Sequence, residues 1–254
     1  MASRFYVDPE RIDLKRNKAL VDREEAHHMI DVMGMKEYDS VVVFDGTGCE
    51  YTGFVEKIDE QTKTVTIGII KTERPSLERA PEIHLAQSLP KKSKMDYVVE
   101  KATELGASRI LPIISERTLV RPDKSSAERK VSRWKRIAAQ TSKQCRRYSV
   151  PHVSKIASYK DIIKKLDQYD VVLLACLSGD TMPLKDSLSG FKSGKVLVLI
   201  GPEGDFSPGE VSDAARDNCR RVSLGQRVLK SDTAGLFVLS VLGYELSQPV
   251  KDDD

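Results

Sequence analysis

The stretch VLVLIGPEGDFSPGE, at Val196–Glu210, reads as a short buried strand that ends in a Gly-Pro-Glu-Gly turn and leads directly into a helix. Ser207 stands at the expected N-cap of that helix, Pro208 at its first position and Glu210 at its third. This order predicts a capping box. Gly201 and Gly204 let the backbone of the turn approach a ligand closely.

A second glycine turn follows after one helix and one short strand. It reads LGQRVLKSDTA at Leu224–Ala234 and carries Arg227 and Lys230. Turns that follow parallel strands face one crevice at the carboxyl edge of a sheet, so we expect a small-molecule site with cations at its rim. Neither turn has the G-x-G-x-x-G spacing of a dinucleotide-binding loop, which counts against NAD or FAD.

The composition is that of an ordinary globular protein, with 40% hydrophobic and 31% charged residues in 254. The longest uncharged run near the C-terminus, Thr233–Tyr244, is too short to span a bilayer, and Met1–Glu10 has no signal pattern. The four cysteines are scattered and form no C-x-x-C pair. We therefore expect no metal site, no disulfide framework, no membrane partner and a cytoplasmic location.

Positive charge is concentrated in the C-terminal part of the chain. Residues 1–80 hold 12 Lys and Arg against 16 Asp and Glu, whereas residues 109–147 hold 12 basic residues and three acidic ones. A solvated helix face usually mixes both signs, so this excess favours a nucleic-acid partner. A basic segment without a partner is the alternative.

The first seventy residues are typical of strands. Val41–Phe44, Tyr51–Ile58 and Thr64–Ile70 are rich in Val, Ile, Tyr and Thr, and one short helix is expected at Arg23–Val32. This pattern predicts a small closed β-barrel. Lys71–Pro81, with a proline near each end, is the expected linker.

After Pro81 strands and helices alternate, which predicts an α/β domain with a mostly parallel sheet covered on both faces. The expected strands are Ile83–Leu89, Arg109–Ile114, Val171–Ala175, Lys195–Ile200 and Arg221–Leu224. The expected helices are Lys92–Leu105, Ser126–Gln144, Tyr159–Leu166, one from Ser207, and Asp232–Leu246. The last helix is apolar almost all round, so it is either a central core helix or a helix shared with a second subunit.

Several segments, taken in order, resemble the RsmE family, the 16S ribosomal RNA uridine N3-methyltransferases of the SPOUT class. In the C-terminal part they are Gln87-x-x-Pro90-Lys91-x-x-Lys94, Lys101-x-x-Glu104-Leu105-Gly106, Pro112-x-x-x-x-Arg117, Trp134-x-x-Ile137-Ala138, Gln144-x-x-Arg147-x-x-x-Pro151, Ile200-Gly201-Pro202-Glu203-Gly204 and Leu224-Gly225-x-Arg227-Val228-Leu229. In the N-terminal part they are Arg4-Phe5-Tyr6-Val7, His27-His28 and Val43-Phe44-Asp45-Gly46. The resemblance runs from about Arg4 to Tyr244.

The resemblance implies a PUA-like, RNA-binding β-barrel at residues 1–74 and a trefoil-knotted SPOUT methyltransferase domain at residues 75–254. It also implies S-adenosylmethionine as cofactor, 16S rRNA of the small ribosomal subunit as substrate, and a homodimer. In that dimer the apolar last helix becomes part of the knot and of the subunit contact.

The chain departs from the family pattern at several positions. Asp205 stands where a second glycine is usual, and Lys230 and Asp232 replace an arginine and a glutamate. Lysine keeps the charge of arginine but loses its bidentate fork. Gly34 and Cys145 stand where arginine and serine are common. These departures bear on the RNA contacts rather than on the class of enzyme.

Methylation of uridine N3 needs an in-line attack on a sulfonium methyl, loss of the imide proton, and stabilisation of charge on the uracil carbonyls. We expect Arg227 to supply that stabilisation; the alternative is that it pairs with Glu203 or a phosphate. Asp232 and Glu203 are the candidate general bases, and each has an alternative as a helix cap or loop strut. His27 and His28 are expected to be a packing or RNA-facing pair.

We expect the cofactor to be bound by backbone groups of the two turns, with one apolar wall from the strand before them. These residues are Ile200, Gly201, Gly204, Leu224, Gly225 and Leu229, with Leu174 as the wall. The expected phosphate contacts are Arg4, Lys91, Lys94, Arg117, Arg147 and Lys230, although Lys91 and Lys94 could instead belong to a solvated loop. Phosphate contacts would make RNA affinity fall steeply with salt.

Three other functions stay open. The first is a SPOUT enzyme that modifies another RNA position, such as a ribose 2′-hydroxyl. The second is a non-catalytic RNA-binding or ribosome-assembly factor that has kept the fold. A nicotinamide-dependent oxidoreductase is a distant third, because the phosphate-binding glycine pattern is missing.

Overall fold

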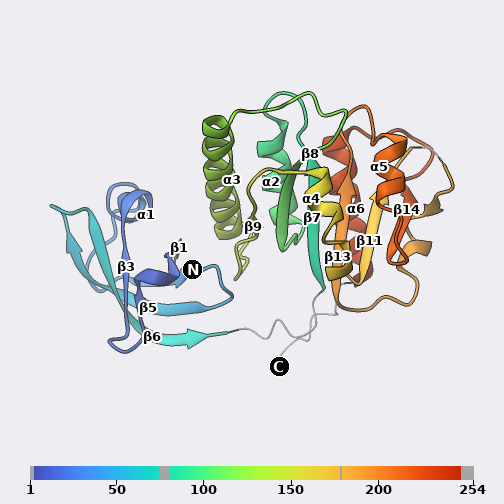
Figure 1. Cartoon of the computed structure of the whole chain (residues 1–254). Helices are drawn as coiled ribbons and strands as arrows, with labels where there is room; N and C mark the ends of the chain where they lie inside the picture. The colour runs from blue at the N-terminus through green and yellow to red at the C-terminus, as the bar shows by residue number, and fades with distance from the viewer. Residues whose placement is uncertain (1–2, 75–80, 178, 247–254) are drawn as a thin grey trace. The chain divides into compact units, whose positions relative to one another are not determined.

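A computed structural model describes residues 3–74, 81–177 and 179–246 of the chain. The chain divides into two compact units (Figure 1). One comprises residues 1–77 and 139–150, and the other comprises residues 78–138 and 151–254. The expected linker falls mainly on residues 75–80, outside the described residues, and its first three residues, Lys71–Glu73, form the end of a strand instead.

The first unit contains a mixed six-stranded sheet in the order β1-β4-β5-β6-β3-β2, in which β1 and β4 are parallel and the other neighbours antiparallel. Its strands are β1 (Ser3–Tyr6), β2 (Ile12–Asp13), β3 (Lys18–Val21), β4 (Ser40–Phe44), β5 (Glu50–Asp59) and β6 (Thr64–Glu73). Helix α1 (Arg23–His27) continues as one π-helical turn, η2 (His28–Val32), and a 3₁₀ turn, η1, spans Pro9–Arg11.

Alternate residues of these strands build one hydrophobic core. Val41 and Val43 of β4 and Val65 and Ile67 of β6 are fully buried, while residues between them are more exposed, as expected for strands with one face on a core. The three strands and the helix expected here are confirmed. Strands β1, β2 and β3 are shorter and were not predicted.

The second unit is built on a parallel sheet in the order β10-β8-β7-β13-β11-β14-β12, with β9 paired to β8. Its strands are β7 (Glu82–Ser88), β8 (Arg109–Ile114), β9 (His152–Val153), β10 (Ala157–Ser158), β11 (Val171–Ala175), β12 (Met182–Pro183), β13 (Lys195–Ile200) and β14 (Cys219–Ser223). Its helices are α2 (Lys94–Glu104), α3 (Lys124–Gln144), α4 (Tyr159–Ile163), α5 (Pro208–Asp213) and α6 (Ser231–Leu246), with 3₁₀ turns η3 (Leu166–Gln168) and η4 (Asp186–Leu188).

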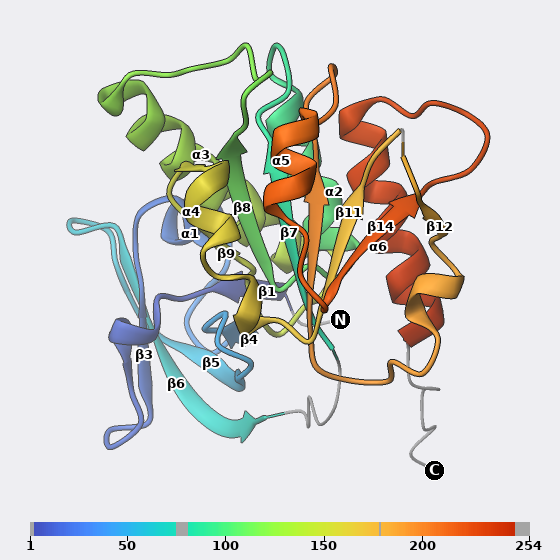
Figure 2. The ribbon, with the colours of Figure 1, turned by 45° about the vertical axis from the view of Figure 1, so that its right-hand side comes forward.

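Helices cover both faces of this sheet, as the sequence predicts (Figure 2). Helices α4 and α5 lie on one face, and α2 and α6 on the other. All five residues of β11 are buried, because this strand lies in the sheet interior with both faces covered. The α/β fold class is confirmed; the trefoil knot stays a prediction.

Helix α6 is not buried on most sides. Val238, Leu239 and Leu242 are fully buried, but the aromatic side chains of Phe237 and Tyr244 are 40% and 82% exposed. The helix therefore packs one apolar face onto the sheet and presents another outward. Within the described part of the chain, none of the helices has the length and apolar character needed to cross a membrane.

Candidate functional site

The carboxyl ends of β11, β13 and β14 lie next to one another, because β11 pairs in parallel with both of the other strands. Ala175 lies opposite Ile200 on one side and opposite Val222 on the other. The turns that leave these three strands therefore meet at one edge of the sheet. This is the place where ligands bind in open parallel α/β sheets.

A cavity of about 350 Å³ lies between the three turns; we call it the strand-end crevice. Its lining residues are Ala175–Leu177, Ile200–Glu203, Asp205, Ser223–Ser231 and Ala234. The two glycine turns predicted from the sequence thus lie on the same cavity. The crevice falls in the volume range of small-molecule sites and combines apolar walls with backbone polar groups.

The first turn is fixed by buried hydrogen bonds. Ser231 at the start of α6 donates its hydroxyl proton to the Gly201 carbonyl at 2.5 Å, and the Gln87 side-chain amide donates to Ser231 Oγ at 2.8 Å. Gly201 itself has no room for a larger residue, since an added Cβ would lie 3.0 Å from the Phe206 amide nitrogen. The backbone of this turn is therefore preformed.

Asp205 clips the first turn to the end of β11. Its φ of +59° lies in the left-handed region that a glycine would adopt most easily. The carboxylate accepts hydrogen bonds from the Leu177 amide at 2.9 Å and from the Phe206 amide at 2.8 Å. The aspartate thus keeps the backbone angle expected of the usual glycine and adds a bond between two walls of the crevice.

The helix after this turn begins as predicted. Ser207 Oγ accepts from the Glu210 amide, and Glu210 Oε2 accepts from the Ser207 amide at 3.0 Å, which completes the capping box. Glu210 also accepts from the Glu116 amide at 2.7 Å, so the helix start is joined to the loop after β8.

The second turn is far more open. Gly225, Gln226, Arg227 and Lys230 are exposed, and Val228 is 75% exposed. Arg227 lines the crevice and makes no ion pair or hydrogen bond with another of the described residues, so the expected alternative of a pair with Glu203 is not present. The guanidinium of this arginine is therefore available to a ligand or substrate.

The two candidate bases have structural partners. Glu203 is exposed at the crevice and accepts a hydrogen bond from the Lys91 amide at 3.0 Å. Asp232 lies inside the first turn of α6 rather than at its N-cap, which corrects the expected position, and pairs with Lys94 at 2.8 Å. A carboxylate in the first helical turn is favoured by the helix dipole.

Two predicted cofactor residues lie just outside the lining of the crevice. Leu174 is fully buried in the sheet core, and the wall it was expected to form is made by the next residue, Ala175. Gly204 is not part of the lining, and its carbonyl accepts a hydrogen bond from Arg117 at 2.7 Å. Sequence reasoning gave no site role to Gln87 or Ser231; the polar pair Gln87-Ser88 at the end of β7 was the available signal for the first of them.

The expected phosphate contacts divide into two groups. Lys91 and Lys230 are exposed, whereas Lys94 is ion-paired. Arg4 donates to Glu50 Oε2 and to the carbonyls of Ser142 and Arg147, so three of its five donors are used inside the first unit. The Arg147 side chain is partly buried, and this burial lowers the pKa of its guanidinium.

The two histidines of the first unit have different surroundings: His28 also lies 3.4 Å from the Lys143 ammonium. His27 contacts Asp31 four residues on, and the His28 ring packs edge-on against Phe5 at 5.8 Å. His28 therefore packs partly into the unit while His27 is exposed, and the choice between packing and an RNA-facing role stays a prediction.

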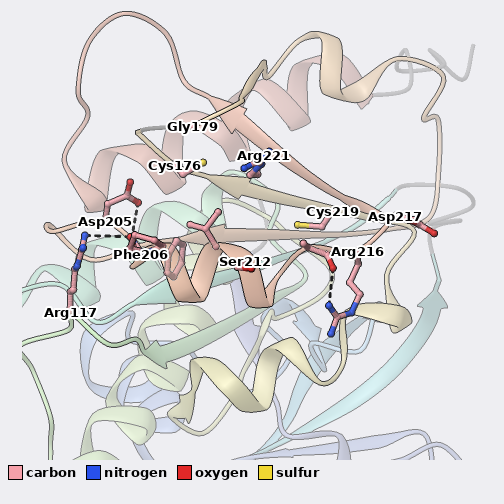
Figure 3. A pocket seen from close by; sticks show the side chains of 13 residues that line it. Arg117, Cys176, Gly179, Asp205, Phe206, Ser212, Arg216, Asp217, Cys219 and Arg221 are labelled. Carbon is pink, nitrogen blue, oxygen red and sulfur yellow. Dashed lines mark hydrogen bonds between the residues drawn. The ribbon is translucent and has the colours of Figure 1, made fainter.

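A larger cavity, of about 770 Å³, lies beside α5 and shares Cys176 and Asp205 with the strand-end crevice (Figure 3). Arg117 lies near Asp205 and Phe206, whereas Arg216 and Asp217 lie apart from them. Burial raises the pKa of the Cys176 thiol, which therefore stays protonated and unreactive near neutral pH. Despite its size, this cavity is lined by only Asp205 of the first glycine turn and by no residue of the second, so the strand-end crevice is the better candidate site.

The described residues were also compared with the side-chain clusters that bind metal ions. Within residues 3–74, 81–177 and 179–246, no three His, Cys, Asp or Glu side chains gather where they could hold a metal ion.

Comparisons with known proteins agree with this geometry. A family described as RNA methyltransferase domain matches residues 78–243, and one described as RNA methyltransferase PUA domain matches residues 21–68. The chain is 29% identical over 251 residues to ribosomal RNA small subunit methyltransferase E of Bacillus subtilis, covering 95% of this chain and 96% of that protein.

Two solved structures share the whole fold. A methyltransferase from Legionella pneumophila in complex with S-adenosylmethionine superposes with a TM-score of 0.83 at 27% identity, over 96% of this chain and 98% of that one. Ribosomal RNA small subunit methyltransferase E from Neisseria gonorrhoeae, bound to S-adenosylmethionine, gives 0.81 at 25% identity over the same shares. The resemblance stated from the sequence is confirmed, and the chain belongs to the RNA methyltransferase family.

Proposed function

We propose that this protein transfers a methyl group from S-adenosylmethionine to N3 of a uridine in 16S rRNA of the small ribosomal subunit. The observation that carries the proposal is the strand-end crevice, where three turns meet, the Gly201–Asp205 turn is preformed, and Arg227 stands exposed at the rim. Relatives that cover nearly the whole chain are small-subunit rRNA methyltransferases, and solved neighbours hold S-adenosylmethionine.

The residues of the crevice suit this cofactor. Apolar side chains of Ile200, Leu224 and Leu229 offer surface to an adenine ring, and backbone groups of Gly201 and Gly225 approach without a Cβ. The tight packing at Gly201 keeps this backbone in place. When bound, the cofactor supplies a sulfonium methyl group as the electrophile. Leu174 and Gly204, which do not line the crevice, would support its lining residues rather than contact the cofactor.

Arg227 would stabilise negative charge on the uracil as N3 loses its proton and attacks. Its guanidinium is permanently charged and can donate to a carbonyl oxygen on which charge develops. Because it has no carboxylate partner among the described residues, it need not break an ion pair to do so. Preorganised donors of this kind contribute most when they cost no rearrangement.

The proton on N3 needs an acceptor, for which Glu203 and Asp232 remain the candidate carboxylates. Glu203 is exposed at the crevice and held by one backbone amide, so its second oxygen can face solvent or substrate. Asp232 is fixed by Lys94 and is better placed to position the start of α6. Glu203 is therefore the stronger candidate.

The RNA would be held by the basic part of the second unit, with Lys91 and Lys230 next to the crevice. Arg117 would act indirectly, by holding the Gly204 carbonyl. Residues 1–74 would form a separate RNA-binding domain, and residues 75–254 the catalytic domain. The exposed face of α6 carries two large aromatic side chains, Phe237 and Tyr244, and suits contact with a second copy of the chain. The protein would work in the cytoplasm, where its free cysteines stay reduced.

The test is nucleoside mass spectrometry of 16S rRNA after incubation with the protein and labelled S-adenosylmethionine, using RNA from a strain that lacks this protein. We expect labelled N3-methyluridine. A 2′-O-methyl nucleoside would instead assign another position. Cofactor binding without any methylated nucleoside, on both free RNA and assembled subunits, would favour a non-catalytic factor.

A further inference from the structure

A third cavity, of about 200 Å³, lies between the segment before α2 and the N-terminal half of α3. Its lining residues are Leu89, Pro90, Lys92, Ser93, Met95, Asp96, Val120, Ser126, Arg129, Lys130, Arg133 and Trp134. All of them belong to the second unit. Arg129, Lys130 and Arg133 belong to the basic segment 109–147 that favoured a nucleic-acid partner, but none of the lining residues was named as an RNA or cofactor contact from the sequence.

The charge in this cavity is strongly unbalanced. Four cationic side chains, Lys92, Arg129, Lys130 and Arg133, face one carboxylate, Asp96. That carboxylate is already engaged, since Asp96 Oδ2 pairs with Arg133 at 2.6 Å and Oδ1 accepts from the Trp134 indole N–H at 3.0 Å. Such a concentration of one sign attracts anions from solution.

Three of the four cationic side chains form no ion pair with another of the described residues. In the described ranges of the chain, no carboxylate pairs with Lys92, Arg129 or Lys130. Lys92 is further held at a φ of +59°, a backbone angle that costs a lysine about 1 kcal/mol. Strain at a residue of this kind is typical of functional sites.

The loop that carries Lys92 is also tied to the strand-end crevice. The amide of its neighbour Lys91 donates to Glu203, and Lys94 pairs with Asp232. An anion in this cavity would therefore sit on an element that is bonded to both candidate bases. This makes the cavity a place for a part of the substrate rather than for an unrelated ion.

We propose that this cavity binds one backbone phosphate of the RNA substrate, at a nucleotide that flanks the target uridine; the inference rests on the proposed function. Arg129 can donate two parallel bonds to phosphate oxygens, and Lys92 and Lys130 add point charges. Trp134 is only 3% exposed, so it forms a wall and cannot stack on a base. The site positions the RNA strand and does not read its sequence.

The test compares two triple variants with equal loss of charge. The first is Lys92→Gln, Arg129→Gln and Lys130→Gln; the control is Lys160→Gln, Lys164→Gln and Lys165→Gln, at exposed positions around α4. We expect the cavity variant to bind a 16S rRNA fragment about tenfold more weakly and to lower the slope of log affinity against log salt by about one. The control keeps the parent slope. Equal slopes in the two variants would overturn the proposal.

Trp134 is the single tryptophan of the chain, so its fluorescence reports on this cavity directly. We expect RNA to change its emission in the parent protein but not in the cavity variant. Inorganic phosphate at millimolar concentration is the second probe. If phosphate alone gives the full change and RNA gives none, the site takes a free anion and the RNA proposal is wrong.

The two proposals fail in different ways. A parent protein that binds RNA but transfers no methyl group removes the proposed function. A parent protein that does transfer the methyl group, together with a cavity variant whose RNA affinity equals that of the control, removes only the phosphate site. In both variants the affinity for S-adenosylmethionine, measured by calorimetry, should equal that of the parent.

Discussion

The two glycine turns of the crevice are built in opposite ways. In the turn at Gly201–Asp205 the carbonyl of Gly201, the carbonyl of Gly204 and the carboxylate of Asp205 are all hydrogen-bonded to residues outside it. The turn at Leu224–Lys230 is mostly exposed, and its Gly225 amide makes a long hydrogen bond of 3.4 Å to Ser223, the last residue of β14. One turn is a fixed platform; the other is free to respond to a ligand.

This difference suggests a division of work. The fixed turn holds a backbone surface against which a cofactor can dock without paying for loop ordering. The exposed turn presents Arg227, the charge that the reaction needs. Substitutions in the fixed turn should therefore act on stability and cofactor affinity, and those in the exposed turn on turnover.

Arg227→Ala should have the largest effect, on turnover alone. Loss of one preorganised donor to a developing charge costs about 10²–10³-fold in rate. Arg227→Lys, which keeps the charge without the fork, should recover part of it. Methyl transfer under saturating cofactor measures the rate, and calorimetry should give an unchanged cofactor affinity. Turnover near that of the parent would end the assignment of Arg227.

Gly201→Ala should act on the fixed turn by steric overlap. Its new Cβ would lie 3.0 Å from the Phe206 amide nitrogen, so the turn must move. We expect a loss of about 1–3 kcal/mol in the free energy of unfolding and weaker cofactor binding. Denaturant titration and calorimetry check both. An unaltered midpoint would show that this turn is not fixed.

Gly225→Ala is the matched change in the exposed turn. No atom lies within 4 Å of the added Cβ, so the cost comes only from the φ of +108°, which an alanine adopts poorly. We expect about 1–2 kcal/mol, relieved by movement of the exposed loop. The rate of methyl transfer should fall markedly, while the midpoint of denaturant unfolding should shift only slightly. A larger loss of stability than Gly201→Ala produces would reverse the comparison.

Asp205→Gly should have the smallest effect. It removes two hydrogen bonds but relaxes the left-handed backbone angle, so the net cost is about 1 kcal/mol. Cofactor affinity should fall about fivefold. Asp205→Asn, whose amide oxygen can still accept and which tolerates this angle, should behave like the parent. Hydrogen exchange at the Leu177 amide gives an independent readout: it should speed up in the glycine variant alone.

The main elements of both units could be predicted from sequence because their patterns are strong. The apolar runs of β11 and β13 and the capping box at Ser207 depend on residues close together in the chain. Strands β9, β10 and β12 have two residues each, too few for any periodicity to be seen. The predicted domain boundary at residue 74 stays a prediction. The end of α3, from residue 139, belongs to the first compact unit rather than to the second.

The position of the candidate site could be predicted from the sequence, but the hydrogen bonds that fix its turns could not. That Gly201 and Gly225 face one cavity follows from two turns after parallel strands. The bond from Arg117 to the Gly204 carbonyl joins residues 87 positions apart, and the one from Gln87 to Ser231 joins residues 144 apart. No local pattern encodes such partners. Ala175 lines the crevice and Leu174 does not, because neighbouring residues of a strand point to opposite faces of the sheet.

Helix α6 begins at the crevice, where Ser231 and Ala234 are part of the lining. Further along the same helix, the side chains of Phe237 and Tyr244 are exposed. If two copies of the chain associate through that outward face, ligand occupancy and self-association become linked equilibria. Where cofactor binding favours association, thermodynamic reciprocity requires that association strengthen cofactor binding by the same factor. Apparent cofactor affinity would rise with protein concentration, and dilution would empty the site.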